Sequence, residues 1–471
     1  MERTFLPDYL SIKDGILHYQ GINLMDLLGK YGTPLEVSYT DLINERVKDL
    51  KGLFAQSIKK NKYLGTYSYA YATKANYSSE AVVTALNNTD LIETSSNNDL
   101  GILEELHNKG ILPAGYTIIC NGFKDQSYFE RIVRLVKKGL KVIPVIENLD
   151  EIQYILRLDT HMDIGIRINI DDAIKNLRIK PHGDQNTRFG IYFDDIPGIV
   201  QKIKNSPNLK LKLFHFHLGG TIQNINEWIR IIGYIYENYY CAIKKLDTNL
   251  EYFDFGGGFP VQYSLEKTFN YKQLVDKTIK KIKTISDKHH LEHPQLIGEH
   301  GRYTVADHGF LILKVDIVKQ IEKNHYWYLV DSSFMGFLPD SWAIKQNFII
   351  HPINFIRNKK TNVKLGGRTC DPDDIYYDQE KRRYLKLPQI EDNETLYLGV
   401  FSTGAYQKII SGIDSPHHCL IPEGVELVIN KKNAKENEYI VADKKQTNEE
   451  ILKILSYDKK TTLKNYTSND K

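Results

Sequence analysis

The stretch YSYAYATKANYSSEAVV, residues 67–83, combines a short apolar run with the start of a helix. Residues 67–73 have the aromatic and small side chains of a buried β-strand. The Ser-Ser-Glu that begins at Ser78 supplies residue types that cap a helix N-terminus. A single lysine, Lys74, stands between the two parts. The stretch therefore predicts one strand-loop-helix unit, with an ammonium group at the strand end.

The same pattern recurs along the chain from about residue 60 to residue 310. Helical patterns follow the strand candidates, for example over residues 99–110 and 128–139. Seven further strand candidates are DLIETSS (90–96), YTIICNG (116–122), KVIPVIE (141–147), DIGIRIN (163–169), KLKLFHFHL (210–218), EYFDFGGG (251–258) and QLIGEHG (295–301). Eight β/α units favour an α/β fold with a (β/α)8 barrel over an open sheet.

After residue 310 the pattern changes to alternating aromatic and β-branched segments, such as HYWYLVDSS (325–333) and VELVINKK (425–432). This alternation predicts an antiparallel β domain, to which strand-like pieces within residues 16–41 also belong. We expect four segments: residues 1–45 packing with the β domain, a barrel over 46–309, the β domain over 310–435, and a charged, partly disordered tail over 436–471.

Composition narrows the class of protein. The formal net charge of +3 creates no general field that would attract nucleic acid, and no stretch approaches the roughly 20 apolar residues of a membrane span. The four cysteines, Cys120, Cys241, Cys370 and Cys419, are widely separated and form no disulfide framework. We expect a cytoplasmic protein without a signal peptide.

In a (β/α)8 barrel the active site lies at the carboxyl ends of the strands, so polar residues there are candidates for chemistry. Lys74 ends the first strand, and a desolvated lysine can attack a carbonyl to form a Schiff base. Taken alone, Lys74 is better explained as a surface lysine near a helix start. Glu93 ends the next strand and could alone be a capping acid.

Two later strand ends offer a ring and a backbone turn. His215 and His217 of HFHLGG (215–220) point to the same side of a strand. No carboxylate or cysteine stands nearby in the sequence to complete a metal-ligand set, so we favour a ring that stacks on a flat cofactor, with a core role still open for His215. DFGGGFP (254–260) resembles an anion nest, although a glycine run can also be a simple turn.

GEHGR (298–302) adds Glu299 and Arg302, which alone could form a surface salt bridge. The combination is more specific than its parts. A lysine for an aldehyde, a histidine for a ring face, glycines and an arginine for a phosphate, and a carboxylate for a ring nitrogen describe a pyridoxal phosphate site.

With these residues in place, the sequence resembles the alanine-racemase-like (fold type III) pyridoxal-phosphate decarboxylases of basic amino acids. The resemblance runs from about residue 20 to about residue 430. Six motifs carry it in the family's order: YATKAN (71–76), HFHLGG (215–220), FDFGGGFP (253–260), GEHGRYTVA (298–306), RTCDPDDI (368–375) and STGAYQ (402–407).

The resemblance implies a role for each matched residue. Lys74 would form the Schiff base, Glu299 would pair with the pyridine nitrogen, and His217 would stack on the ring. Cys370 would come from the partner subunit of a homodimer and act as the proton donor. The remaining matched positions would bind the cofactor: Glu93, Arg167, Gly256, Gly257, Gly258, Arg302 and Tyr406.

Within the family, IICNGFKD (118–125) and LPDSWAIKQNFIIHPI (338–353) resemble biosynthetic arginine decarboxylases in a compact form. Asp371 and Asp374 suit a guanidinium, which pairs with carboxylates through parallel hydrogen bonds, although both acids could be solvated loop residues. We therefore expect decarboxylation of L-arginine to agmatine in polyamine synthesis. Mg²⁺ stays an option that the residues do not decide.

Several alternatives remain open. The same chemistry could act on ornithine, lysine, meso-diaminopimelate or a carboxylated polyamine. A non-catalytic homologue is disfavoured because Lys74 and Cys370 both match, and a racemase is disfavoured by the CDPDD stretch. Two departures stand out: Gly220 replaces a common serine, for which Thr221 could substitute, and His300 replaces a common proline.

Overall fold

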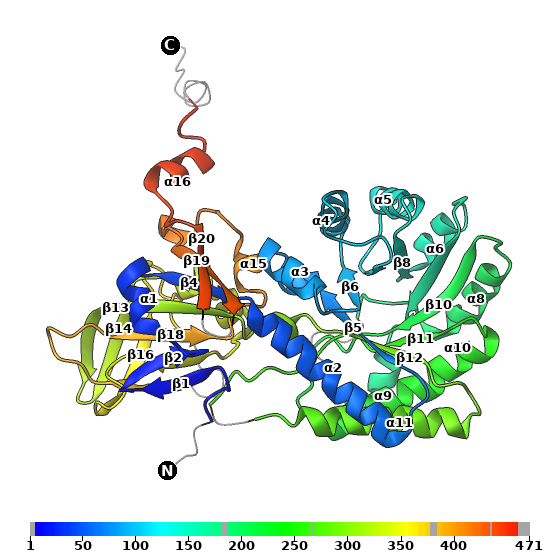
Figure 1. Ribbon diagram of the computed structural model, residues 1–471, viewed down its shortest axis with the longest axis horizontal. Helices are drawn as coiled ribbons and strands as arrows, with labels where there is room; N and C mark the ends of the chain where they lie inside the picture. The colour runs from blue at the N-terminus through cyan, green and yellow to red at the C-terminus, as the bar shows by residue number, and fades with distance from the viewer. Residues whose placement is uncertain (1–4, 180–186, 266–267, 377–383, 434–435, 460–471) are drawn as a thin grey trace. The chain divides into compact units, whose positions relative to one another are not determined.

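A computed structural model describes residues 5–179, 187–265, 268–376, 384–433 and 436–459. Contacts along the chain divide it into two compact units (Figure 1). The barrel unit contains the described residues within 43–260 and 269–304. The β unit contains those up to Leu42, those within 261–268 and those from Val305 onward.

Eight parallel strands close the barrel in chain order, which confirms the (β/α)8 prediction. Each strand overlaps the segment expected from the sequence. The strands are β5 (Tyr67–Ala72), β6 (Leu91–Thr94), β7 (Thr117–Cys120), β8 (Lys141–Ile146), β9 (Met162–Arg167), β10 (Leu209–His215), β11 (Tyr252–Asp254) and β12 (Gln295–Glu299).

Helices precede, connect and follow these strands (Figure 1). They are α2 (Asp41–Asn61), α3 (Ser79–Leu86), α4 (Asn97–Asn108), α5 (Gln126–Lys137), α6 (Leu149–Ile155), α7 (Asp171–Leu177), α8 (Ile196–Lys204), α9 (Ile225–Ile235), α10 (Cys241–Leu246), α11 (Tyr271–Lys288) and α12 (Arg302–Val305).

Short polar side chains set where several of these helices begin. Ser96, Asp125 and Asn148 accept backbone N–H bonds at the starts of α4, α5 and α6. Each cap lies a few residues after a strand end, so the loops at that end of the barrel are short. Short loops hold the polar residues that follow each strand close to the barrel rim.

The barrel interior is packed with apolar side chains from several strands. This core consists of Ala70, Leu91, Ile119, Ile143, Val145, Leu213 and Ile297, all at most 6% exposed. Filling by side chains makes the barrel a solid core, so a ligand has room only at its rim.

The β unit is built around a nine-stranded sheet and a separate three-stranded sheet, β1 (Leu10–Lys13), β2 (Ile16–Tyr19) and β3 (Ile22–Asn23). The larger sheet contains β4 (Leu35–Tyr39), β13 (Gly309–Glu322), β14 (His325–Val330), β15 (Ile349–Pro352), β16 (Lys360–Gly366), β17 (Leu385–Pro388), β18 (Tyr397–Phe401), β19 (Val425–Asn433) and β20 (Glu436–Asp443). Its short helices are α1 (Leu24–Tyr31), α13 (Phe334–Phe337), α14 (Pro339–Ile344), α15 (Gln407–Ser411) and α16 (Asn448–Ile454).

Most pairings in the larger sheet are antiparallel, as expected, but β14 with β16 and β4 with β19 are parallel. The sheet also extends past the expected boundary at residue 435, because β20 pairs with β19 from Asn433↔Glu436 to Glu426↔Asp443. The segment that we expected to be a tail from residue 436 therefore begins as an edge strand.

Among the described residues, no helix has both the length and the apolar character needed to cross a bilayer.

Candidate active site at the carboxyl ends of the barrel strands

Polar residues follow nearly every strand of the barrel at its carboxyl end. Lys74 lies in the single turn, Thr73–Ala75, that follows β5, and Glu93 lies within the last two residues of β6. Asn121 comes directly after β7, and Glu299 ends β12. Because parallel strands end at one rim, these side chains meet there.

Lys74 and Glu93 form an ion pair at the rim. The Lys74 Nζ atom lies 2.9 Å from Oε2 of Glu93 and 3.3 Å from the hydroxyl of Ser95. The Glu93 side chain is fully buried, whereas that of Lys74 is 38% exposed. Burial alone would raise the pKa of Glu93, but the Lys74 ammonium and hydrogen bonds from Lys74, Ser95 and Asn121 hold it below its ordinary value. Glu93 thus fixes the lysine with its amine open to the pocket.

Asn121 forms hydrogen bonds with two of the predicted acids. The sequence did not identify it as a site residue. Its side-chain nitrogen donates to Oε1 of Glu93 at 3.0 Å and to Oε1 of Glu299 at 2.7 Å. The signal that could have found it is its position, since a polar residue directly after a barrel strand lies at the rim.

The floor of the site is a buried cluster of His215, Asp254 and Glu299. His215 Nδ1 lies 3.2 Å from Oδ2 of Asp254 and 3.9 Å from Oε1 of Glu299. The sequence placed no carboxylate near His215, but the fold brings two next to it, so our reason for disfavouring a metal does not hold in space. His215 belongs to the site rather than to the apolar core.

Burial controls the protonation of this cluster. It raises the pKa of Glu299 to about 8, with a further contribution from the neighbouring Asp254. It also raises the pKa of Asp254 to about 7 and lowers that of His215 to about 4. A cation placed against Glu299 would favour its ionised form and offset the effect of burial.

Two carboxylate oxygens of this cluster, Oδ2 of Asp254 and Oε2 of Glu299, are buried and have no hydrogen-bond partner in the described part of the chain. Of these two residues, Glu299 lines the pocket. A buried carboxylate oxygen without a donor is costly, so a bound N–H group would stabilise it.

His217 presents a neutral ring next to the glycine loop. Its Nδ1 accepts the backbone N–H of Gly219 at 2.8 Å. Burial, together with the Lys74 and Arg167 cations, lowers its pKa well below the ordinary value. The ring therefore stays uncharged and suits contact with a flat group.

Glycine is required at three successive positions after β11. A Cβ atom on Gly256 would lie 2.8 Å from the His217 ring, one on Gly257 would lie 2.5 Å from the Glu299 carbonyl oxygen, and one on Gly258 would lie 2.7 Å from the Gly220 carbonyl oxygen. Gly256 and Gly258 also have positive φ angles of 66° and 98°. The loop can approach both neighbouring strand ends only without side chains. Arg302 follows at the start of α12.

Arg167, at the end of β9, is fixed by two contacts. Its Nη1 lies 3.0 Å from Oε2 of Glu147, and its guanidinium stacks on Phe189 with 4.6 Å to the ring centroid. Glu147 also accepts the Gly122 backbone N–H at 2.7 Å. Arg167 therefore connects the ends of β7, β8 and β9.

These residues surround a pocket of about 630 Å³. Its lining includes Lys74, Asn121, Arg167, His215, His217 and Glu299. The volume suits a ligand of cofactor size together with a small substrate.

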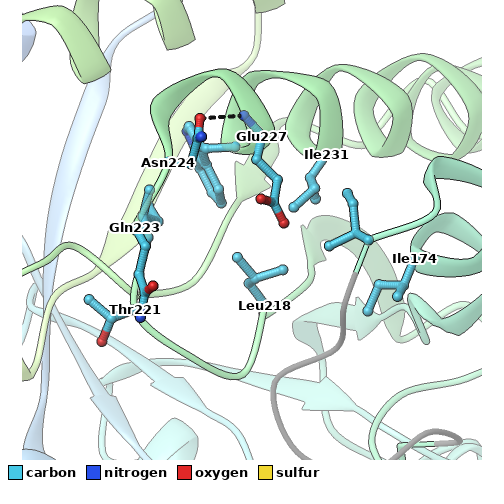
Figure 2. Close-up of a pocket in the computed structure, with 10 residues that line it drawn as sticks. Ile174, Leu218, Thr221, Gln223, Asn224, Glu227 and Ile231 are labelled. Carbon is cyan, nitrogen blue, oxygen red and sulfur yellow. Dashed lines mark hydrogen bonds between the residues drawn. The ribbon is translucent and has the colours of Figure 1, made fainter. Parts of the chain in front are cut away.

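A smaller pocket of about 340 Å³ adjoins the first and shares Ile174 and Leu218 with it (Figure 2). Figure 2 shows the Glu227 carboxylate directed between Leu218 and Ile231. Glu227 is the one charged side chain among the described residues that line it. The side pocket therefore has mixed walls and one carboxylate. Its lining is apolar at Ile174, Ile179, Leu218, Ile222, Trp228 and Ile231, and polar at Thr221, Gln223 and Asn224.

The structure explains His300, the departure for which the sequence offered no reason. Its ring is buried, lies 2.8 Å from the Tyr67 hydroxyl through Nε2, and packs edge-on against Phe259. Burial lowers its pKa to about 3, so it stays neutral. His300 is part of an aromatic cluster next to the site.

Four predicted residues lie in the β unit. Cys370, Asp371 and Asp374 lie between β16 and β17, and Tyr406 immediately precedes α15 with a left-handed backbone at φ 70°. Cys370 is exposed, and the Asp371 side chain is 29% exposed. These two residues are accessible within their own unit.

Asp374 differs from our expectation. It is 2% exposed, and its two oxygens accept five hydrogen bonds, from the Ser333 hydroxyl, the Phe334 and Met335 N–H groups, and the N–H and hydroxyl of Thr369. These donors fill its lone pairs and leave no room for a guanidinium. The geometry argues for a structural role in this loop, and we no longer assign it to the substrate.

Three features of the barrel pocket fit pyridoxal phosphate. An amine at the rim would hold an aldehyde, a loop that only glycine can form would hold a phosphate, and the unpartnered Glu299 oxygen would accept a pyridine N–H. Fold and site together thus define a barrel-type pyridoxal phosphate enzyme.

Comparison with known proteins agrees with this class. Residues 50–306 match the family model described as pyridoxal-dependent decarboxylase, pyridoxal binding domain. The chain belongs to this family of pyridoxal-phosphate-dependent decarboxylases. Its cofactor is pyridoxal 5'-phosphate.

Individual relatives are more distant. The chain is 24% identical to biosynthetic arginine decarboxylase of Tolumonas auensis, over 87% of this chain and 84% of the relative. It is also 24% identical to that of Geobacter sp. strain M21, over 93% and 86% of the two chains.

Solved structures share the fold. Biosynthetic arginine decarboxylase SpeA from Campylobacter jejuni superposes with a TM-score of 0.82 at 20% identity, covering 98% of this chain and 92% of that one. Diaminopimelate decarboxylase from M. jannaschi gives 0.79 at 20% identity, covering 95% and 97%.

Proposed function

We propose that this enzyme decarboxylates L-arginine to agmatine and carbon dioxide, as a step toward polyamines. The observation that carries a decarboxylase is the barrel pocket, where Lys74 and the unpartnered Glu299 oxygen face one cavity. Support for arginine comes from the curated relatives, which are named biosynthetic arginine decarboxylases. The shared fold does not discriminate between substrates, since diaminopimelate decarboxylase has it as well.

Lys74 would hold the cofactor covalently, and its pairing with Glu93 positions the amine for this. Glu299 would accept the pyridine N–H through Oε2 and keep that nitrogen protonated. His217 would pack its neutral ring on the cofactor. When bound, pyridoxal phosphate accepts the electron pair that departing carbon dioxide leaves behind.

The loop of Gly256, Gly257 and Gly258 would hold the phosphate, with the backbone N–H groups of Gly257 and Gly258 as donors, because the Gly256 N–H donates to Oδ1 of Asp254 at 2.8 Å. Arg302 would add a guanidinium and Tyr406 a hydroxyl, both of which are good phosphate donors. Arg167 would close the pocket on the side of β9, where Glu147 fixes its guanidinium.

Cys370 of a partner subunit would donate a proton to the substrate carbon after carbon dioxide leaves. A hydrogen bond with Cys419 raises the pKa of Cys370, which keeps the thiol protonated and suits a donor. The functional molecule would then be a homodimer, which we place in the cytoplasm.

A carboxylate must recognise the cationic end of the substrate. Asp371 is accessible and directly follows Cys370, so we assign the guanidinium to it. Glu227 is the competing candidate, because its side pocket adjoins the main pocket and suits an extended chain with a distal cation.

The test is identification of the amine produced. Purified holoenzyme is incubated separately with L-arginine, L-ornithine, L-lysine, meso-diaminopimelate and a carboxylated polyamine, and products are separated by chromatography. We expect agmatine from arginine and no amine from the others. Another amine in place of agmatine would reject arginine and keep decarboxylation, whereas no amine from any substrate would favour a non-catalytic binding protein.

A further inference from the structure

Two thiols of the β unit lie in contact. The sulfur of Cys370 is 3.4 Å from that of Cys419, although 49 positions separate them in the chain. Both residues are exposed, whereas the other two cysteines, Cys120 and Cys241, are buried. The pair is therefore open to small solutes and lies on two different loops.

The loop that carries Cys419 has an unusual backbone. Cys419 and Leu420 have φ angles of 55° and 51°, a left-handed conformation that L side chains rarely adopt. Two such residues in succession cost conformational energy, so surrounding contacts must hold them there. In this conformation the Cys419 thiol contacts that of Cys370.

Ionisable side chains surround the two sulfurs. A ring nitrogen of His418 lies within 4.8 Å of both sulfur atoms, and its Nε2 is 3.7 Å from Oδ2 of Asp371. Cys370 is protonated at rest, so a thiolate forms only when a base takes up the proton, and the His418 imidazole can do so once it moves into hydrogen-bond contact. The cluster therefore combines two thiols with a base.

We propose that Cys370 and Cys419 form a reversible disulfide when the enzyme meets a hydroperoxide. One thiolate attacks the peroxide, an S–O bond forms, the O–O bond breaks and hydroxide leaves, which produces a sulfenic acid. The second thiolate attacks that sulfur, an S–S bond forms, the S–O bond breaks and a second hydroxide leaves. The two thiols lose two electrons, and hydrogen peroxide with their two protons becomes two water molecules.

Little motion is needed for this step. The sulfurs, now 3.4 Å apart, must approach by about 1.4 Å to reach the disulfide bond length of about 2.0 Å. No other described cysteine contacts either sulfur, because Cys120 and Cys241 are buried in the barrel unit. Neighbouring thiols that resolve a sulfenic acid also protect it from irreversible oxidation.

The consequence for activity rests on the proposed function. If Cys370 is the proton donor, its disulfide has no proton to give, so oxidation would switch the enzyme off and a thiol reductant would restore it. Asp371 lies in the same cluster, so the disulfide would also hold the loop that we assign to the substrate cation.

The experiment exposes holoenzyme to hydrogen peroxide with a chelator present, blocks remaining thiols, and maps peptides by mass spectrometry without reduction. Wild type should yield a Cys370–Cys419 linked peptide that dithiothreitol removes. Cys419→Ser should yield none, and Cys241→Ser, which alters a buried thiol, should behave as wild type. Absence of the linked peptide in oxidised wild type would overturn the disulfide.

Activity is followed in the same samples, relative to each untreated protein. Wild-type activity should fall at least tenfold and return with dithiothreitol. In Cys419→Ser no second thiol traps the Cys370 sulfenic acid, so excess hydrogen peroxide should oxidise it to the sulfinic acid, and dithiothreitol should not restore activity. A linked peptide in fully active enzyme would keep the disulfide but overturn the switch, together with the role of Cys370. Activity that falls reversibly in Cys419→Ser while Cys370 is found unmodified in the peptide map would also overturn the switch, because another group would then be responsible.

Discussion

Glu299 and Asp254 form a buried pair of acids whose pKa values lie above the ordinary range, at about 8 and about 7. The folded protein therefore binds protons at this pair more tightly than the unfolded chain does. The resulting stability is fully present below the unfolded pKa values and is lost as pH rises through the folded ones.

Glu299→Gln should change this pH dependence in the cofactor-free protein. The neutral amide removes a titrating group, so the free energy of unfolding of the variant relative to wild type should rise by about 3–4 kcal/mol between about pH 5 and pH 8. Urea unfolding at several pH values measures it. The exposed Glu130→Gln on α5 is the control, and an equal pH dependence for all three proteins would contradict the assignment of a buried, protonated Glu299.

Two carboxylates compete for the substrate cation, and mutation separates them. Asp371→Asn should raise the KM for L-arginine about 10- to 100-fold with a smaller change in kcat, because it removes one charge-assisted pair. Asp373→Asn, on the same loop, is the control. If Glu227→Gln has that effect and Asp371→Asn does not, the side pocket of Figure 2 binds the cation instead.

At the scale of single residues, the sequence identified site residues that stand in recognisable motifs, but not the side chains that they contact. Lys74, His217 and Glu299 stand in motifs, and each lies at the pocket. Asn121 and Asp254 also lie in quoted stretches, but the sequence assigned no role to either, because their role depends on which strands become neighbours. Asp374 shows the opposite case. It lies in a quoted motif, but backbone N–H groups already donate to both of its oxygens, and the sequence does not show this loop conformation.

At the scale of elements, the loop after β11 is the most constrained part of the site. Gly258→Ala should lower cofactor affinity at least about tenfold, because its φ of 98° and the contact with the Gly220 carbonyl leave no place for a methyl group. Titration with pyridoxal phosphate, followed by absorbance, measures the affinity, and circular dichroism checks the fold.

The matched control is Gly198→Ala on the exposed side of α8, where nothing lies within 4 Å of the added Cβ atom. It should leave affinity unchanged and stabilise the protein by about 0.5–1 kcal/mol, because alanine favours a helix. Equal cofactor affinity in both variants would remove the glycine loop from the phosphate site.

Element prediction succeeded where burial left a pattern. The barrel strands are buried and apolar, so all eight could be located from the sequence. β20 was not predicted because seven of its eight residues are exposed. An edge strand with both faces exposed to solvent shows no alternation of apolar and polar residues. Strand direction also escaped prediction, since alternation is the same in the parallel pair β4 and β19 as in an antiparallel one. The start of α16 did carry a signal, the capping box of Thr447 and Glu450.

At the scale of the whole molecule, a shared active site in a homodimer predicts complementation. Lys74→Ala and Cys370→Ala should each be nearly inactive, because one removes the cofactor anchor and the other the proton donor. Subunits exchanged at random form heterodimers with one intact site, so the mixture should recover about a quarter of wild-type activity. Activity after exchange under mild denaturant measures this.

Each variant taken through the same exchange alone is the control. A mixture as inactive as its components, with heterodimers demonstrated by a mass tag, would place Lys74 and Cys370 of one site in the same subunit.

The central claim is decarboxylation at the barrel pocket through Lys74, and release of labelled carbon dioxide tests it most directly. Purified wild type and Lys74→Ala are incubated with pyridoxal phosphate and carboxyl-labelled L-arginine, and the gas is trapped and counted. We predict steady release by wild type and a loss of about a thousandfold or more in the variant, with its fold checked by circular dichroism. Equal release by both proteins, or none by wild type from any carboxyl-labelled basic amino acid, would contradict the account.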